Sequence, residues 1–400
     1  MTEMLTLAGP VPLASPSEHR YGHPAGDRML VCKRVQRVTS DMKTFVFEPV
    51  APVVPGAQAA QGGTTAPRDP GRFQYDFRHD PGQHLVFTFE IDGQETERRY
   101  SICSPPSRPR LVAITVKRVP GGLVSNWLHD HLKAGDTVRA RGPFGHFSMA
   151  RHPAPAYLFL SGGSGITPLM SMTRTLYDLA SGADAVFVHS ARTPEDIPFR
   201  QELELISGTM PNIRVVHVCE DGGASEAWSG HRGRLTAGLL RLIAPDFLER
   251  EVFTCGPPGY MRAVRELLAA AGFPMDRHHQ ETFGAAAAPT RPSAAPVDAD
   301  VATGSEGATV GGATRFAVEL SRSGRTIECD SATPVLEAAA RAGITLPSSC
   351  GQGLCGSCMT TLEKGSVDMR HNGGIHPRDT ARNKILLCCS TPRENLVIDA

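Results

Sequence analysis

Short apolar runs broken by turn residues dominate the chain from residue 29 to about residue 149. Within these runs, β-branched and aromatic residues recur between polar ones, as expected of half-buried strands. The runs lie at residues 29–38, 44–50, 84–93, 111–119 and 136–145. Several short strands at this spacing predict an antiparallel β-barrel or sandwich.

The pattern changes after residue 156, where strand-like runs begin to alternate with helix-like runs. The alternation of short buried strands with amphipathic helices predicts an α/β domain with a parallel sheet, whose ligands bind at the carboxyl edge. The strand-like runs are 156–162, 185–191, 213–220 and 251–257, and the helix-like runs are 168–181, 198–207 and 258–272.

The last part of the chain has a third pattern. Residues 315–330 are typical of a hairpin, residues 334–344 of an amphipathic helix and residues 395–400 of a strand. Together they predict a small α+β domain.

Three stretches of small residues, Pro and Gly interrupt these patterns. Such compositions bury too little apolar surface to offset the entropy of the chain. They predict a disordered arm at 1–27, a surface insertion at 50–71 and a flexible linker at 284–313. The folded domains are therefore expected at residues 28–152, 153–283 and 314–400.

The overall charge does not favour a polyanionic partner. Lys plus Arg and Asp plus Glu both total 41, so there is no bias of the kind that marks nucleic-acid binding. The N-terminus lacks the pattern of a signal peptide, and no apolar stretch approaches the roughly 18 residues of a membrane span. We expect a cytoplasmic protein without membrane insertion.

Four of the ten cysteines form a metal-binding pattern. Cys350, Cys355 and Cys358 have the C-x4-C-x2-C spacing of plant-type [2Fe–2S] proteins, with Cys388 or Cys389 as a distant fourth ligand. Zinc usually prefers paired C-x2-C knuckles, and only one such pair is present, so zinc is the less favoured alternative.

These residues give the C-terminal domain a resemblance to the plant-type ferredoxin family, which implies a β-grasp fold. The segment that ends in Cys388-Cys389-Ser390-Thr391-Pro392 resembles the ferredoxin signature in which the ligand precedes a proline by four residues. This resemblance favours Cys388 over Cys389.

Arg98-Arg99-Tyr100-Ser101, preceded by Pro81-Gly82-Gln83, resembles the flavin signature of the ferredoxin–NADP⁺ reductase superfamily. The resemblance implies that Arg98 pairs with a flavin phosphate, that the Tyr100 ring stacks on the isoalloxazine and that Ser101 donates a hydrogen bond near flavin N5. Bidentate phosphate pairing and aromatic stacking suit these residue types.

A second flavin motif starts at Gly121-Gly122. Gly122 and Ser125 resemble the Gly-x-x-Ser start of a helix whose free N–H groups hold a pyrophosphate. A pyrophosphate implies FAD, whereas a subgroup of reductases with the same domain order uses FMN.

Two glycine-containing motifs resemble the nicotinamide site of the same superfamily. The first follows a strand and precedes a helix, so its backbone can approach a dinucleotide. The second places Cys255 beside the nicotinamide ring, although a buried structural thiol is an alternative. The motif residues are Gly162, Gly163, Gly165, Thr167, Pro168, Cys255, Gly256, Pro257 and Met261.

The choice of dinucleotide depends on the segment after His189-Ser190-Ala191. Arg192 could accept the 2′-phosphate of NADPH, whereas Glu195 and Asp196 favour the free 2′-hydroxyl of NADH. We expect NADH, with NADPH as the alternative.

The combined motifs imply a reductase that accepts hydride from NADH and passes electrons singly through FAD and a [2Fe–2S] cluster. Tyr100, Ser101 and Cys255 would lie nearest the hydride step. The domain order resembles reductase components of Rieske-type oxygenases that act on glycine betaine and similar quaternary ammonium compounds. It also resembles the NADH reductase of the hybrid-cluster protein, and a non-enzymatic electron-transfer subunit of a dehydrogenase is a third, more distant alternative.

Overall fold

The structure is a computed structural model that describes residues 28–50, 77–223, 228–282, 314–344, 346–348, 351, 353, 356, 358–371, 375 and 377–400. Its contacts divide the chain into two compact units, Met1–His279 and Gln280–Ala400. The predicted arm at 1–27, the linker at 284–313 and all but Val50 of the predicted insertion lie outside the described residues.

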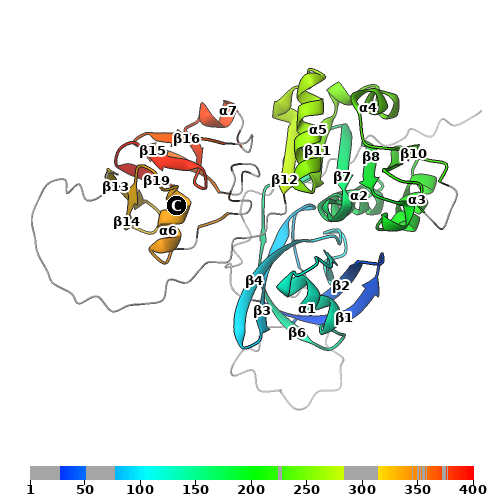
Figure 1. Ribbon diagram of the computed structural model, residues 1–400, viewed down its shortest axis with the longest axis horizontal. Helices are drawn as coiled ribbons and strands as arrows, with labels where there is room; N and C mark the ends of the chain where they lie inside the picture. Colours follow the sequence, from blue (N-terminus) through cyan, green and yellow to red (C-terminus); the bar gives the residue numbers. More distant parts are fainter. Residues whose placement is uncertain are drawn as a thin grey trace, which may run out of the picture. The chain divides into compact units, whose positions relative to one another are not determined.

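The first sheet of the N-terminal unit is antiparallel and has the strand order β4-β3-β6-β1-β2-β5 (Figure 1). A bridge between Ile102 and Ile114 also brings the residue after β4 against β5, at the opposite edge of the sheet. The strands are β1 (Arg28–Arg37), β2 (Met42–Pro49), β3 (His84–Ile91), β4 (Gln94–Ser101), β5 (Val112–Lys117) and β6 (Thr137–Phe144), and the helix α1 (Leu123–Asp130) lies between β5 and β6 in the chain.

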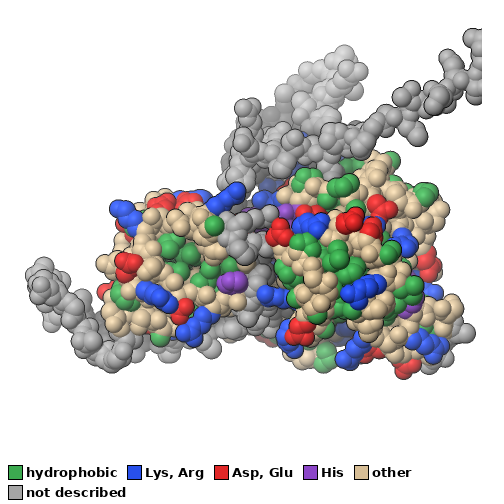
Figure 2. All heavy atoms as spheres, turned by 90° about the horizontal axis from the view of Figure 1, so that it is seen from above, with side chains coloured by type: hydrophobic (Ala, Val, Ile, Leu, Met, Phe, Trp, Pro, Cys, Tyr) green, Lys and Arg blue, Asp and Glu red, His purple; other side chains and the backbone are tan. Residues whose placement is uncertain are grey.

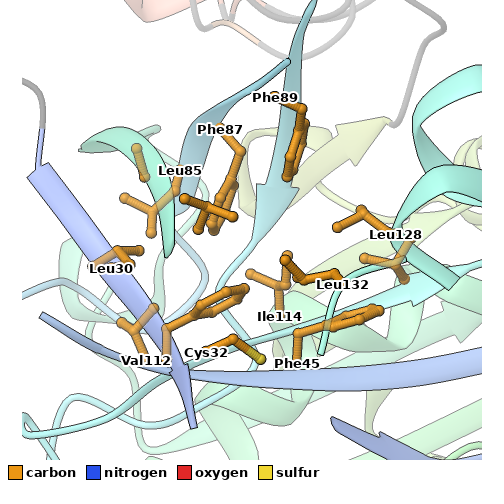
Figure 3. Packing of buried hydrophobic residues seen from close by; sticks show 14 of the residues in the cluster. Leu30, Cys32, Phe45, Leu85, Phe87, Phe89, Val112, Ile114, Leu128 and Leu132 are labelled. Carbon is orange, nitrogen blue, oxygen red and sulfur yellow. The ribbon is translucent and has the colours of Figure 1, made fainter. Parts of the chain in front are cut away.

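Alternating side chains of this sheet form one apolar core. Phe87 from β3, Phe45 from β2, Ile114 from β5 and Leu128 from α1 are fully buried and belong to the same cluster. Figure 3 shows side chains from these elements and from β1 directed toward one another. The predicted alternation of apolar and polar positions therefore has its expected consequence, one face of each strand facing the core.

The second sheet has the order β10-β9-β8-β7-β11-β12, and β10, β9, β8, β7 and β11 pair in parallel, as predicted. Its strands are β7 (Ala156–Gly162), β8 (Asp184–Ala191), β9 (Ile213–Cys219), β10 (His231–Arg232), β11 (Glu251–Gly256) and β12 (His278–Thr282). The helices are α2 (Ile166–Asp178), α3 (Arg200–Thr209), α4 (Ala237–Ile243) and α5 (Pro258–Ala270), with the 3₁₀ turn η2 (Gly163–Gly165) before α2.

Helices cover both faces of this parallel sheet. On one face Phe159 and Phe187 contact apolar residues of α2 and α3, whereas Leu158 and Val188, on the other face, contact those of α4 and α5. Strands buried on both sides explain the nearly continuous apolar runs in the sequence.

The C-terminal unit contains a five-stranded sheet of order β14-β13-β19-β15-β17 and a two-stranded sheet of β16 and β18. The predicted hairpin, helix and final strand are confirmed as β13 with β14, α6 and β19. The bounds are β13 (Arg315–Leu320), β14 (Arg325–Asp330), α6 (Val335–Arg341), β15 (Met359–Lys364), β16 (Val367–Met369), α7 (Pro377–Thr380), β17 (Lys384–Leu386), β18 (Ser390–Pro392) and β19 (Leu396–Ile398).

Charged side chains of both signs are mixed on the part of the surface seen in Figure 2. On the face drawn in Figure 2, Lys and Arg side chains lie among Asp and Glu side chains on each unit. This mixture agrees with the balanced composition of the chain.

Candidate functional site

The predicted flavin residues lie together at the end of β4. In the antiparallel register Arg98 is opposite Phe87, and Tyr100 is opposite Leu85. The side chains of Arg98 and Tyr100 therefore lie on the same face of the sheet as those of Phe87 and Leu85. The Tyr100 ring meets the Phe87 ring edge-on, with 6.0 Å between centroids. Burial raises the pKa of Tyr100, so its hydroxyl stays protonated and can donate a hydrogen bond.

The structure also brings the Pro81-Gly82-Gln83 turn to this strand. The backbone amide of Ile102, directly after the buried Ser101, donates to the carbonyl of Gln83 at 2.9 Å. Arg98 is half-buried and its guanidinium donates to the Glu97 carbonyl at 2.7 Å. A half-buried guanidinium and an amphipathic ring on one strand face are chemically suited to a phosphate and a flavin ring.

Helix α1 begins at Leu123, after Gly122, as the motif predicted. Gly122 supplies no side-chain cap, and the first amides of a helix have no acceptor within the helix. The Ser125 hydroxyl accepts a hydrogen bond from the Val119 amide at 3.1 Å, so it helps to shape the turn. The first-turn amides are therefore the donors best suited to a phosphate.

The two predicted nicotinamide motifs are in direct backbone contact. A Cβ added to Gly165 would lie 2.2 Å from the carbonyl oxygen of Cys255, closer than any real Cβ contact. Gly163, in the same turn, has φ +51°, in the left-handed region that favours glycine. These two glycines let the turn between β7 and α2 lie directly on the end of β11.

Tyr260, in the first turn of α5, is a part of this site that the motif analysis did not assign. A Cβ added to Gly256 would lie 2.6 Å from Cδ1 of the Tyr260 ring, and one added to Gly162 would lie 3.0 Å from Cγ. The ring thus packs on two strand ends, with too little room for a Cβ at Gly256 and a tight fit for one at Gly162.

The remaining motif residues lie around this contact. Thr167 is buried and its hydroxyl donates to the Ser164 carbonyl at 3.2 Å, which closes the first turn of α2. Pro168, Cys255 and Met261 are buried, whereas Pro257 is exposed at the edge of the sheet. A buried Cys255 at a strand end is compatible with both roles considered for it in the sequence.

A polar row runs across four neighbouring strands on the α2 and α3 side of the parallel sheet. The strand register aligns Cys255 with Ser161, Ser161 with His189 and His189 with His217. Nδ1 of His189 and the hydroxyl of Ser161 are 2.7 Å apart. Burial lowers the pKa of His189 to about 3 and that of His217 to about 4, so both rings are neutral at pH 7.

The predicted ribose segment follows β8. Arg192 is exposed and forms an ion pair with Asp196, with 3.4 Å between Nε and Oδ2. The Asp221 amide donates to the Arg192 carbonyl at 2.8 Å, which ties this segment to the end of β9. Trp228, which sequence reasoning missed, packs against the small cluster of Ala191, Ile197 and Cys219.

Two of the four predicted cluster ligands are described, and the structure brings them together. Cys358 and Cys388 are buried, and the backbone amide of Cys388 lies 3.5 Å from the Cys358 sulfur. The Gly353 amide donates to the Cys388 sulfur at 3.2 Å. Backbone amides directed at sulfur stabilise thiolate charge, so this donor set fits an iron–sulfur cluster. Cys350 and Cys355 lie outside the described residues.

The rival cysteine has a different backbone partner. The Cys389 thiol is half-buried and donates to the Leu386 carbonyl at a sulfur–oxygen distance of 3.6 Å. Its neighbour Cys388 is the one that receives an amide hydrogen bond from Gly353.

Known families match each of the three regions. Residues 73–149 match the oxidoreductase FAD-binding domain, residues 159–266 the oxidoreductase NAD-binding domain and residues 318–393 the 2Fe-2S iron-sulfur cluster binding domain. Over 94% of its length the chain is 43% identical to the glycine betaine monooxygenase reductase subunit of Pseudomonas aeruginosa, covering 95% of that protein. The chain belongs to the monooxygenase reductase subunit family.

Another relative in this reductase family is the stachydrine N-demethylase reductase subunit of Rhizobium meliloti, which is 40% identical over 81% of this chain and 89% of that protein. The solved structure of phthalate dioxygenase reductase has the same modular fold, with a TM-score of 0.50 and 24% identity, covering 94% of this chain and 98% of that one.

The reductase is thus a multidomain oxidoreductase that uses FAD, NAD(H) and a [2Fe–2S] cluster, as the motifs predicted. Within the part of the chain that the structure describes, no helix is long and apolar enough to cross a membrane.

Proposed function

We propose that this reductase takes hydride equivalents from NADH and supplies electrons singly to a Rieske-type oxygenase that demethylates glycine betaine or a related quaternary ammonium compound. The observation that carries the proposal is the 43% identity with a glycine betaine monooxygenase reductase subunit across nearly the whole of both chains. When bound, FAD supplies the conversion between two-electron and one-electron chemistry. The residues of the chain bind and orient the cofactors.

For the flavin we propose that Arg98 holds a phosphate, that Tyr100 covers the ring and that Ser101 donates to it. The shared strand face of Arg98 and Tyr100 supports these roles. Gly122 and Ser125 would shape the first turn of α1, whose amides receive the pyrophosphate.

For the dinucleotide we propose the turn between β7 and α2 together with the end of β11. The backbone contact of Gly165 with Cys255 supports this assignment, because it brings the two motifs together to form one surface. The proposed residues are Gly162, Gly163, Gly165, Thr167, Pro168, Arg192, Cys255, Gly256, Pro257 and Met261.

The ion pair between Arg192 and Asp196 supports NADH over NADPH. A 2′-phosphate would have to compete with the Asp196 carboxylate for the Arg192 guanidinium. The negative charge of Asp196 would also repel the phosphate. We expect a higher kcat/KM with NADH, and a preference for NADPH that is lost in Arg192→Ala would contradict the proposal.

For the cluster we propose Cys350, Cys355, Cys358 and Cys388 as ligands. The amide hydrogen bond from Gly353 to Cys388, and the bond of the Cys389 thiol to the Leu386 carbonyl, support this choice.

We further propose that the antiparallel sheet is a closed barrel, that the C-terminal unit is a β-grasp domain and that the protein works in the cytoplasm. The bridge between Ile102 and Ile114 supports barrel closure. The proposed domain bounds are 28–152, 153–283 and 314–400, joined by the linker at 284–313.

Reconstitution tests the function directly. The purified reductase, a purified betaine-type oxygenase component, glycine betaine, oxygen and NADH should release formaldehyde in proportion to the NADH consumed. A chain ended near Asp300 keeps the compact unit Met1–His279 and should still reduce ferricyanide, yet fail to release formaldehyde. Reduction of the hybrid-cluster protein in place of the oxygenase would contradict the proposed partner.

A further inference from the structure

Helix α2 touches both halves of the N-terminal unit. It begins at the dinucleotide turn, and Ser171, Arg174 and Asp178 follow one another at intervals of three and four residues. This spacing places the three polar side chains along one side of a helix. All three contact residues 103–108, the segment that follows the flavin strand β4.

The contacts of this side of α2 are hydrogen bonds to specific backbone and side-chain groups. The Ser171 hydroxyl donates to the Ser104 carbonyl at 2.8 Å, and the Arg108 guanidinium donates to the Asp178 carboxylate at 2.9 and 2.6 Å. The amide of Cys103 in turn donates to the Ala113 carbonyl, so this segment is anchored in the flavin sheet.

Arg174 is the centre of the set. Its Nη1 donates to the Cys103 carbonyl at 2.6 Å, and its Nε and Nη2 donate to the two carboxylate oxygens of Glu202 at 2.7 and 2.6 Å. Its guanidinium carbon lies 4.8 Å from the centre of the Phe199 ring. One side chain thus joins the flavin sheet to α2 and to the start of α3.

The burial of Arg174 makes these contacts persistent. Its side chain is only 12% exposed. Burial is the largest single influence and alone would lower the pKa of Arg174, but the hydrogen bond to Glu202 and further interactions with Glu202 and Cys103 together outweigh burial and raise it, so the guanidinium stays charged. Glu202 is only half-buried, but loss of its partner would leave it without a bidentate bond, and loss of Glu202 would leave a buried guanidinium short of its charged partner.

The turn of the flavin motif meets the same helix. A Cβ added to Gly82, which has φ +102°, would lie 2.6 Å from the Met172 side chain of α2. The flavin sheet therefore contacts α2 through Gly82 as well as through residues 103–108.

We propose that Arg174 is a positioning residue that sets the distance between the flavin domain and the nicotinamide domain for hydride transfer. The inference rests on the proposed function, since it concerns the same hydride step. Hydride transfer requires reacting atoms in near contact, so a displacement of about 1 Å in their spacing can lower the rate by about 100-fold. Among the described residues, Arg174 has hydrogen bonds with Cys103 and Glu202 and with none of the residues proposed to hold the cofactors, yet it joins the elements that carry them.

The test compares Arg174→Ala and Arg174→Lys with Arg241→Ala, an exposed arginine on α4 of the same domain. In stopped-flow mixing of NADH with FAD-loaded protein, Arg174→Ala should reduce the flavin about 10- to 100-fold more slowly than wild type. Lysine keeps the positive charge but not the planar guanidinium that bonds to both Cys103 and Glu202. The rate of flavin reduction in Arg174→Lys should therefore lie between those of wild type and Arg174→Ala. Arg241→Ala should match wild type.

Two further measurements separate positioning from binding or folding. The FAD content and the Kd for NAD⁺ should stay within about twofold of wild type, because Arg174 touches neither proposed site. In the FAD-loaded protein without NADH, amide hydrogen exchange should accelerate in residues 103–108 of Arg174→Ala and remain unchanged in residues 84–91.

Unchanged flavin reduction in a folded Arg174→Ala or Arg174→Lys variant would overturn the inference, as would a slower rate that is fully explained by lost FAD or weaker NAD⁺ binding. If Arg174→Ala does not fold, Arg174→Lys decides by the same criteria. Failure of the wild type to reduce its flavin with NADH would instead contradict the proposed function.

Discussion

Two cofactor sites in this chain are built in different ways. One is the proposed dinucleotide site at the ends of β7 and β11, and the other is the proposed cluster site in the C-terminal unit. At the first, backbone contacts such as Gly165 on Cys255 belong to the fold itself. At the second, the proposed ligands Cys358 and Cys388 lie close together, and their role would depend on a metal cluster. The comparison teaches that the first site should survive removal of its ligand, whereas the second should not.

The largest expected effect is at the cluster. Cys388→Ser removes a proposed ligand of the cluster, so iron should fall from about two per chain to almost none. Iron and acid-labile sulfide measured after anaerobic purification check this, together with the flavin content, which should stay at the wild-type level.

Cys389→Ser is the matched control and should keep both iron atoms, because that thiol donates to the Leu386 carbonyl. If Cys389→Ser loses the cluster and Cys388→Ser keeps it, the assignment of the fourth ligand is reversed.

The next largest effect is expected at the flavin strand. Arg98→Ala removes the proposed charge-assisted contact with a flavin phosphate, which would be worth roughly 1.5–3 kcal/mol or about 10- to 100-fold in affinity. Flavin retained after dialysis measures the loss, and the melting temperature of the flavin-free protein should hardly change. Arg99→Ala, at an exposed position on the opposite face of β4, is the control and should retain flavin.

A smaller effect tests the close backbone contact between Gly165 and Cys255 at the proposed dinucleotide site. Gly165→Ala forces a methyl group onto the Cys255 carbonyl and should destabilise the unit by about 1–3 kcal/mol, with weaker NAD⁺ binding. Gly208→Ala, in α3, meets nothing within 4 Å and should stabilise the helix by about 0.5–1 kcal/mol. Equal urea midpoints for the two variants would contradict the close approach.

The smallest effect concerns pH. The pKa of His189 in the folded protein is about 3, below that of an unfolded histidine near 6.5, so the folded state binds fewer protons than the unfolded state below that pH. Stability should therefore fall as the pH falls from about 6.5 toward 3.

Replacing His189 with Gln should remove about 1 kcal/mol of the change in unfolding free energy between pH 7 and 5.5. Urea titrations at both pH values measure this difference. An unchanged slope in His189→Gln would mean that this ring does not stay neutral in the folded state.

The sequence predicted most of the elements because each depends on a local pattern. The alternation in β3, the helix start after Gly122 and the C-terminal hairpin all appear where their residues indicated. The polar row of Ser161, His189 and His217 could not be predicted, because it requires the order β9-β8-β7, which no local pattern contains.

The same limit applies to Tyr260 and Arg174. Tyr260 belongs to a recognised motif, but its packing on Gly162 depends on the pairing of β11 with β7. Arg174 looks like an ordinary polar residue of an amphipathic helix, and only the assembled fold places it beside the Cys103 carbonyl.

The bonds between α2 and residues 103–108 bear on how such reductases can be recombined by engineering. A chimera that joins the flavin domain of one reductase to the nicotinamide domain of another would have to match a buried guanidinium with a foreign backbone carbonyl. A junction beyond His279 leaves those bonds within one parent, because both domains lie in the same compact unit. Exchange of the C-terminal electron carrier should therefore be tolerated more readily than exchange of either half of the N-terminal unit.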